Sequence, residues 1–345
     1  MAGGIGSRFW PLSTAENPKQ FLDVLGIGKT LIQMTYERLL HISPNENIYI
    51  MTNQEYKEKV LEQLPNLSPS QVLTEPERKN TAPCIAYAAG KIQAMNPNAN
   101  LIVCPADHLI MQEDRFKKSI EVALESSQSG RIATIGIAPT RPDTGYGYIE
   151  VNQESSFAPN SIFEVQQFRE KPNLTIAEEF VASGNFFWNS GIFIWKASTI
   201  IDSLMQFQPE LHSLFTENLS MYNTENEQEN VNHAFATCED ISIDFAIMEH
   251  ASNIDVVVAN FDWSDLGTWG SLDGHLKKES NNNALIGDKV SVVNTKNCII
   301  NIPLGKTALI DGLDDYIVIQ SEDKLMILKK ENEQELKQFL TLLKK

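Results

Sequence analysis

Residues 1–21 read MAGGIGSRFWPLSTAENPKQF, and the interpretation of the whole chain starts from this stretch. Three of its glycines allow the backbone to approach a ligand closely: Gly3, Gly4 and Gly6. Consecutive backbone amides in such a turn, leading into a helix, are well suited to bind phosphate. Arg8 and Lys19 add two cations to the same stretch. The stretch therefore predicts a loop that holds a phosphorylated ligand.

Two widespread phosphate loops do not fit this sequence. The dinucleotide-binding pattern G-x-G-x-x-G requires a third glycine, and Phe9 occupies that position. The P-loop pattern G-x-x-x-x-G-K-[ST] has its ending in GIGKT at 26–30, but Asp23 stands where the first glycine should be. Gly28 is better explained as a turn before a helix that begins near residue 31.

Short apolar runs alternate with amphipathic stretches further along the chain. The runs at 47–52, 101–108, 131–140 and 254–263 are rich in Ile and Val and predict buried strands. Amphipathic periodicity predicts helices over 31–42, 81–95 and 115–127, the second with Thr81 as its N-cap. This alternation predicts an α/β fold with a Rossmann-like, mostly parallel mixed sheet flanked by helices.

A change in composition marks a candidate domain boundary. The segment KKESNNNA at 277–284 has no apolar pattern, and closely spaced β-type segments follow it. We expect a catalytic domain over 1–276 and a small β-rich module with a terminal helix over 284–345. That helix is predicted to begin at about Glu331.

The composition excludes several classes of function. A formal net charge of −17 disfavours partners that require a positive field, namely nucleic acid and anionic membranes. No apolar run approaches the ~20 residues that span a bilayer, so we expect a soluble, cytoplasmic protein without a membrane partner. The four cysteines form no C-x-x-C pair and are expected to be buried, free thiols.

The opening stretch fits a third pattern, G-G-x-G-x-R-x-x-P…P-K, and in this it resembles the sugar-phosphate nucleotidylyltransferases. The tryptophan before the proline and the ending PKQF are similar to the branch that makes GDP-mannose. The resemblance continues in order as far as residue 269, in EPERKNTAP (75–83), PADH (105–108), DTGYGYIE (143–150), FREKP (168–172), NSGIFIW (189–195), SIDFAIME (242–249) and WSDLGTW (263–269).

This resemblance implies the nucleotidyltransferase fold and a specific reaction. An oxygen of mannose 1-phosphate would attack the α-phosphorus of GTP in line, giving GDP-mannose and pyrophosphate with the help of Mg²⁺. Two alternatives stay open at this point. The acceptor could be another sugar 1-phosphate, such as that of a heptose or glucose, or the chain could be a catalytically silent regulator that binds sugar nucleotides. Similarity to short family members also implies a homodimer formed through the C-terminal module.

The resemblance assigns the phosphate and metal chemistry to four residues. Arg8 and Lys19 would hold the triphosphate. Asp107 and Asp265 each follow an apolar run, which places them near strand ends, where open α/β sheets bind their ligands. Both carboxylates are therefore expected to hold the Mg²⁺ ion. Asp262 is a weaker candidate for the second carboxylate, and His108 is expected to be structural.

The remaining candidate residues would bind the sugar phosphate and the base. By resemblance, Glu170 would accept hydrogen bonds from sugar hydroxyls, and Lys171 would pair with the phosphate of the sugar. The sugar pocket would also include Tyr146, Gly147, Asn189 and Ser190. Asn80 and Thr81 resemble the base-binding segment. Arg169 stands where the mannose-specific motif usually has valine, and a mild effect is expected because neighbouring strand residues face opposite sides.

One expected element is missing from the sequence. The loop of this family follows a central strand, yet no apolar run precedes Gly3. We therefore expect that the natural start lies upstream and that Met1 is an internal methionine.

Overall fold

The computed structural model describes residues 1–152 and 156–344, and the chain divides into two compact units. One unit, here called the sheet unit, comprises Met1, Leu40–Pro105 and Ile110–Trp263. The other, here called the loop unit, comprises Ala2–Leu39, Ala106–Leu109 and Ser264–Lys345. Both units are discontinuous in sequence, whereas the predicted domain boundary near residues 277–284 is a division along the chain. That boundary stays a prediction.

The sheet unit is built on six strands in the order β3-β8-β5-β9-β7-β6. Their bounds are Asn100–Val103 for β3, Phe186–Lys196 for β8, Ile132–Ile137 for β5, Ile254–Val258 for β9, Ile162–Arg169 for β7 and Tyr148–Val151 for β6. The long strand β8 pairs antiparallel with β3, β5 and β6, and β7 pairs antiparallel with β6 and β9. The pairing of β5 with β9 is parallel.

The α/β class with a mixed, helix-flanked sheet is confirmed, but the mostly parallel pairing predicted for that sheet is wrong. Among the described residues, five of its six pairings are antiparallel. The physical reason is that a continuous apolar run reports burial on both faces, which central antiparallel strands share with parallel ones. Strand β8 was quoted as part of a motif but not predicted as a strand, although its Phe, Trp and Ile residues are typical of one.

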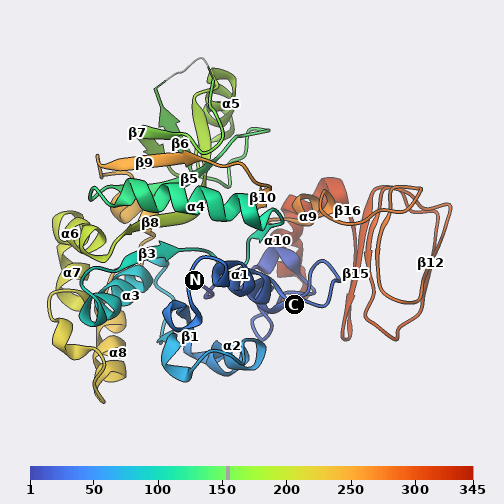
Figure 1. The fold of residues 1–345 in the computed structure, drawn as a ribbon. Helices are drawn as coiled ribbons and strands as arrows, with labels where there is room; N and C mark the ends of the chain where they lie inside the picture. The colour runs from blue at the N-terminus through green and yellow to red at the C-terminus, as the bar shows by residue number, and fades with distance from the viewer. Residues whose placement is uncertain (153–155, 345) are drawn as a thin grey trace. The chain divides into compact units, whose positions relative to one another are not determined.

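Helices cover both faces of this sheet because its strands alternate two sets of apolar side chains. Ala133, Ile194 and Val257 pack with Phe116 and other residues of α4, Glu113–Ser127, which Figure 1 shows running along the strands. Ile132, Phe193 and Val256 belong to a second cluster on the opposite side of their strands. That cluster includes residues of α3 (Thr81–Met95), α6 (Ala197–Phe207), α7 (Pro209–Phe215) and α8 (Glu227–Thr237).

The predicted helices match the structure closely, with one correction at an end. Helix α1 spans Leu31–Leu40, and α3 has the predicted bounds. Thr81 is the first residue of α3, however, and Asn80 is its N-cap. The Thr81 hydroxyl instead accepts a hydrogen bond from the Ile243 amide at 2.8 Å. The sheet unit also includes β1 (Ile50–Asn53) and β2 (Val72–Glu75), which pair in parallel, α2 (Lys57–Gln63) and α5 (Leu174–Ser183).

The loop unit combines the opening loop with the β-rich C-terminal region. Its C-terminal strands are β11 (Ala284–Ile286), β12 (Val290–Val293), β13 (Ile299–Asn301), β14 (Ala308–Asp311), β15 (Tyr316–Ser321) and β16 (Lys324–Lys329). They form one sheet in the order β11-β13-β15-β16 and a second of β12 and β14. The β-rich region is thus as predicted. Residues Lys330–Glu335 form a 3₁₀ helix, and the α-helix α10 begins at Leu336 rather than near Glu331.

The two faces of the larger C-terminal sheet pack into two different hydrophobic clusters. Ile300 and Val318 face the smaller sheet. Ile299, Ile317 and Ile319 belong to a cluster that also contains Phe9 of the opening stretch. Phe9 packs against Trp269 of α9, Trp269–Asp273, with ring centroids 4.8 Å apart. The C-terminal strands therefore support the opening loop within one apolar core.

Two further observations concern the whole described chain. Its helices include none that is long and apolar enough to cross a membrane. All four cysteines are free, with Cys84, Cys238 and Cys298 buried and Cys104 half-buried. The strand expected before Gly3 would lie outside the given sequence, so it stays a prediction.

Candidate functional site

The predicted site residues fall into two sets, one in each unit. The loop unit contains Gly3, Gly4, Gly6, Arg8, Lys19, Asp107 and Asp265. The sheet unit contains Asn80, Thr81, Tyr146, Gly147, Glu170, Lys171 and Asn189.

The opening loop is shaped by a glycine that no other residue could replace without strain. Gly6 has φ +69°, and its carbonyl accepts a hydrogen bond from the Phe9 amide at 2.9 Å. A Cβ at Gly6 would lie 2.5 Å from the Cβ of Lys19. The Lys19 amide also donates to the Ile5 carbonyl at 3.2 Å. The glycine-rich turn therefore packs directly against the backbone that carries Lys19.

Lys19 is a buried cation that binds two acidic segments. Its residue surface is only 4% exposed. Its Nζ lies 2.8 Å from Oδ2 of Asp107 and donates to the Asp265 carbonyl at 2.6 Å and the Leu266 carbonyl at 3.3 Å. A charge this deeply buried requires partners of opposite sign or polarity. The structure thus joins both predicted metal ligands to one predicted phosphate ligand.

The surroundings of Lys19 shift the pKa values of Asp107 and His108 and fix the position of the Asp265 carboxylate. Burial opposes ionisation of Asp107, but the charge and hydrogen bond of Lys19, together with the other nearby positive charges, hold the pKa of Asp107 below its ordinary value. Burial lowers the pKa of the adjacent His108, which favours its neutral form. Asp265 Oδ1 accepts the Gly267 amide at 2.9 Å. A Cβ at Gly267 would lie 2.7 Å from Asp265 Oδ2 and 3.3 Å from Arg8 Nη1, so both side chains converge over this glycine.

The donor set of this cluster suits a divalent cation with a preference for oxygen. Asp107 and Asp265 offer carboxylate oxygens, which are the ligands that Mg²⁺ favours, and Mg²⁺ commonly keeps water and phosphate oxygens in its other positions. The described residues contain no group of three or more His, Cys, Asp or Glu side chains arranged for a metal. Asp262, the weaker candidate, lies in the sheet unit, where it accepts a hydrogen bond from Gln112 at 3.1 Å.

Part of the second set lies around the carboxylate of Glu170. The Glu170 side chain is 6% exposed, and a Cβ at Gly147 would lie 2.5 Å from its Oε2. The Asn189 amide donates to the Gly147 carbonyl at 2.8 Å, which brings strand β8 to the same place. The side chain of Lys171 forms an ion pair with Glu170. We call Gly147, Glu170, Lys171 and Asn189 the glutamate cluster.

Lys171 adopts an uncommon backbone conformation. Its φ is +44°, in the left-handed region, and Pro172 follows it. A non-glycine residue there is strained, and such strain concentrates at functional sites. Arg169 is exposed while the neighbouring Glu170 is turned inward, as expected from strand alternation.

Gly147→Ala is predicted to damage the glutamate cluster selectively. The added Cβ would displace the Glu170 carboxylate, because 2.5 Å is far shorter than any normal contact. We expect KM for the sugar phosphate to rise by about 10–100-fold, equivalent to the loss of one or two hydrogen bonds to a charged group. Steady-state kinetics measures this. Gly145→Ala is the matched control, since its Cβ would approach only the terminal carboxylate of Asp143, and an equal effect of both variants would contradict the prediction.

Tyr146 lies among aromatic side chains beside this cluster. Its ring centroid is 5.0 Å from that of Trp188 and 5.4 Å from that of Trp263, and both contacts are edge-on. The Arg141 guanidinium lies 5.2 Å from the Trp188 ring centroid. Trp188 and Trp195 are buried in the core, as predicted. Ser190 is fully buried and donates to the Ile135 carbonyl at 2.7 Å, so its hydroxyl supports the sheet.

The residues predicted to bind the base are hydrogen-bonded to the segment around Asp240 and Ile243, in which no site residue was predicted. Asn80 Nδ2 donates to Asp240 Oδ1 at 2.5 Å, and Thr81 accepts the Ile243 amide. The same segment continues to Asp244, whose Oδ1 accepts Asn189 Nδ2 at 2.9 Å. Asp244 and Glu249 were missed as site residues, although both lie in the quoted motif SIDFAIME.

Asp244 is predicted to make stability depend on pH. Burial and the nearby charge of Glu170 raise its pKa to about 7, from an unfolded value near 4. Because the folded pKa is the higher one, this contribution to stability is complete below about pH 4 and is lost as the pH rises through 7. Asp244→Asn removes it, so the melting temperature of the wild type should fall relative to that of the variant by roughly 3–6 °C between pH 5 and pH 8. Thermal unfolding at several pH values measures this, and parallel curves would contradict it.

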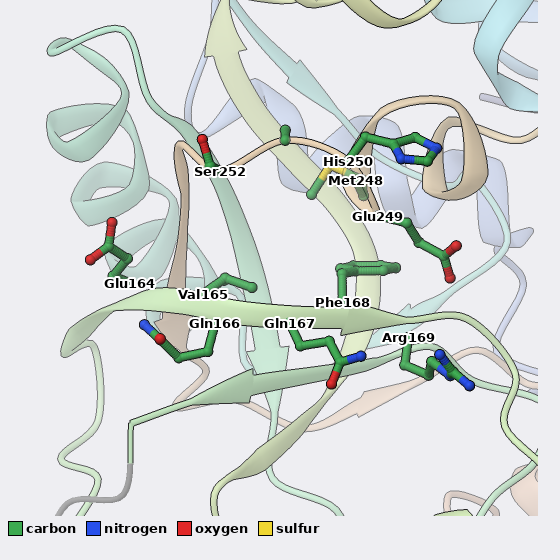
Figure 2. A pocket seen from close by; sticks show the side chains of 11 residues that line it. Glu164, Val165, Gln166, Gln167, Phe168, Arg169, Met248, Glu249, His250 and Ser252 are labelled. Carbon is green, nitrogen blue, oxygen red and sulfur yellow. The ribbon is translucent and has the colours of Figure 1, made fainter.

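A cavity of about 580 Å³ adjoins the end of the segment that contains Asp244 and Glu249. Its walls are strand β7 from Glu164 to Arg169 and the stretch from Met248 to Ser252. Figure 2 shows Phe168 pointing from β7 toward Met248, while Gln167 and Arg169 point to the other side of the strand. Glu249 borders the cavity and accepts the Glu170 amide at 3.0 Å. The cavity therefore adjoins the glutamate cluster at the backbone of Glu170.

Comparisons with known proteins show the family of this chain. A family model described as Nucleotidyl transferase matches residues 1–281. The mannose-1-phosphate guanylyltransferase of Salmonella montevideo is 37% identical, covering 100% of this chain and 73% of that protein. The alginate biosynthesis protein AlgA of Pseudomonas aeruginosa is 36% identical, covering 98% of this chain and 70% of that protein.

A solved structure described as mannose-1-phosphate geranyltransferase from Thermus thermophilus has a TM-score of 0.88 to this chain. The identity is 26%, and the match covers 100% of this chain and 98% of that one. The chain belongs to the nucleotidyl transferase family. The predicted family and the prediction of a nucleotidyltransferase enzyme are therefore confirmed.

Proposed function

We propose that this chain transfers GMP from GTP to α-D-mannose 1-phosphate, giving GDP-mannose and pyrophosphate. The observation that carries the proposal is the buried ammonium of Lys19, which binds Asp107 and the Asp265 backbone beside a glycine-rich turn. Family membership supports the reaction class, and the name of the Salmonella montevideo relative supports the choice of GTP and mannose 1-phosphate as substrates.

The reaction requires positioning and charge neutralisation rather than covalent catalysis. A phosphate oxygen of mannose 1-phosphate forms a bond to the α-phosphorus of GTP. The bond between the α-phosphorus and the bridging oxygen breaks, and pyrophosphate leaves with the electron pair. Arg8 and Lys19 hold the triphosphate and neutralise the charge that develops on the leaving group. The backbone amides of the turn around Gly3, Gly4 and Gly6 contribute further donors.

Asp107 and Asp265 are the residues that would hold Mg²⁺. The ion would neutralise phosphate charge and orient the reacting groups. Lys19 keeps the pKa of Asp107 low, so this carboxylate is ionised at neutral pH and ready to bind a cation.

The glutamate cluster is assigned to the sugar phosphate. Glu170 and Asn189 bind sugar hydroxyls, Lys171 binds the phosphate, and Gly147 leaves room for Glu170. Tyr146 forms an apolar wall of the pocket. Asn80 and Thr81 are assigned to the base. Residues 1–276 would supply the catalytic region. A homodimer formed through residues 284–345 and a cytoplasmic location remain predictions.

The experiment is a substrate panel. Release of pyrophosphate is measured in Mg²⁺ with GTP, UTP, dTTP or ATP, each combined with the 1-phosphates of mannose, glucose and a heptose. We expect the highest kcat/KM for GTP with mannose 1-phosphate. A higher value with another pair would keep the reaction class and overturn the substrates. A folded protein that binds GDP-mannose yet turns over no pair would be a regulator.

A further inference from the structure

A single segment of the sheet unit contacts both groups of candidate ligand residues in that unit. It runs from Asp240 to Glu249, and we call it the strap. Hydrogen bonds join it to the N-terminal end of α3, to strand β8 and to the residue after β7. Its contacts at each end involve different candidate residues, which lie far apart in sequence.

The first end of the strap holds Asn80 and Thr81. Asp240 accepts a hydrogen bond from the Asn80 side chain at 2.5 Å, and the Thr81 hydroxyl accepts the Ile243 amide at 2.8 Å. The Ala82 amide donates to the Ile241 carbonyl at 3.1 Å. Asn80 has φ +58°, so these three bonds hold a strained backbone at the start of the helix.

The second end of the strap holds the glutamate cluster. Asn189 donates through Nδ2 to Asp244 at 2.9 Å, and its Oδ1 accepts the Gly191 amide at 3.1 Å. The Thr134 hydroxyl also donates to Asn189 Oδ1 at 3.4 Å, so Asp244 at Nδ2 and these donors at Oδ1 together determine which way the Asn189 side chain faces. Glu249 accepts the Glu170 amide at 3.0 Å, immediately before the strained Lys171.

The middle of the strap is a π-helix packed into the core of the sheet unit. Residues Asp244–Met248 form a π-helix, a rare geometry that often occurs at functional sites. The Glu249 amide donates to the Asp244 carbonyl at 3.0 Å, which joins the two acidic residues that hold the glutamate cluster. Ile243, Ala246, Ile247 and Met248 are buried in the core of the sheet unit. The strap is thus anchored in the core between its two ends.

We propose that the strap is the positioning element of the substrate pocket, with Asp240 serving the base and with Asp244 and Glu249 serving the sugar phosphate. The proposal rests on the proposed function for the identity of the ligands. Asp244 and Glu249 act through Asn189 and Glu170 and are positioning residues rather than ligands. The two ends carry separate specificities because they hold different residues.

The test compares KM for mannose 1-phosphate with KM for GTP in variants at each end of the strap. Asp244→Ala and Glu249→Ala are expected to raise KM for mannose 1-phosphate by about 10–50-fold and to change KM for GTP by less than about twofold. Asp240→Ala is expected to raise KM for GTP by about 10–50-fold and to change KM for mannose 1-phosphate by less than about twofold. Asp244→Asn and Glu249→Gln can still accept the same hydrogen bonds and should restore KM to within about fivefold of the wild type.

A merely structural strap would behave differently. The three alanine variants would then lower the melting temperature and shift both Michaelis constants together, and the amide variants would give no rescue. That pattern would overturn the proposal, and so would unchanged constants in all variants that fold.

A second readout separates this proposal from the proposed function. If the wild type turns over no substrate pair, the proposed function fails, and the strap is judged from crystal structures of the wild type and of Asp244→Ala. We expect the Asn189 amide to rotate away from its wild-type orientation in the variant. An unchanged Asn189 would overturn the strap proposal, whatever the activity.

Discussion

Replacing Lys19 with methionine is expected to lower kcat/KM for nucleotidyl transfer by about 10³-fold, a loss typical of removing a preorganised group that stabilises transition-state charge. Methionine keeps the apolar stem of a residue that is 4% exposed, so the packing against Gly6 is preserved. The ammonium that binds Asp107 and the Asp265 carbonyl is lost. Under the proposed function, the phosphates of GTP lose their buried cation at the same time.

The matched control for this variant is Lys29→Met in the same unit. Lys29 is exposed, with an ion pair to Glu37 at 2.6 Å, and exposed pairs contribute little to stability. Its activity should stay within about twofold of the wild type. Steady-state kinetics with circular dichroism as a folding check measures both variants. A folded Lys19→Met protein with near wild-type kcat/KM would remove Lys19 from the catalytic residues.

Replacing Asp265 with asparagine is expected to lower kcat by about 10²–10³-fold and to raise the Mg²⁺ concentration needed for half-maximal rate. Asparagine retains an Oδ1 that can accept the Gly267 amide, and the backbone carbonyl that binds Lys19 is unaffected. The change therefore removes the charge of one proposed metal ligand and leaves the local fold intact.

Asp262→Asn provides the comparison, because Asp262 is an exposed acid three residues earlier that is hydrogen-bonded to Gln112. We expect its Mg²⁺ titration to match that of the wild type. If Asp262→Asn shows the loss and Asp265→Asn does not, the second carboxylate has been assigned to the wrong residue.

Several parts of the fold could be predicted because they depend on local patterns. The helix at 81–95 was predicted with correct bounds, since fifteen residues of helical periodicity give a strong signal. The apolar runs at 131–140 and 254–263 located β5 and β9. Their direction relative to other strands could not be predicted, because burial on both faces gives the same run in either orientation.

The candidate site could be predicted where residues that contact each other lie within one sequence motif. Gly6 and Lys19 lie in one stretch, and the structure brings them into contact. The Lys19 ammonium contacts both Asp107 and the Asp265 backbone. These two residues are more than 150 positions apart, so no sequence motif contains both of them. Asp244 was missed for the same reason, since its partner Asn189 lies on a strand 55 residues away in the sequence.

The central claim is that the chain moves the α-phosphoryl group of GTP, as GMP, onto mannose 1-phosphate. The most direct measurement follows the label from [α-³²P]GTP incubated with mannose 1-phosphate and Mg²⁺, for the wild type and for Asp265→Asn. We predict that the wild type places the label in GDP-mannose and none in pyrophosphate, and that Asp265→Asn forms labelled product at least about 100-fold more slowly. A folded wild-type protein that leaves all label in GTP, or releases it as GMP without forming a nucleotide sugar, would contradict the account.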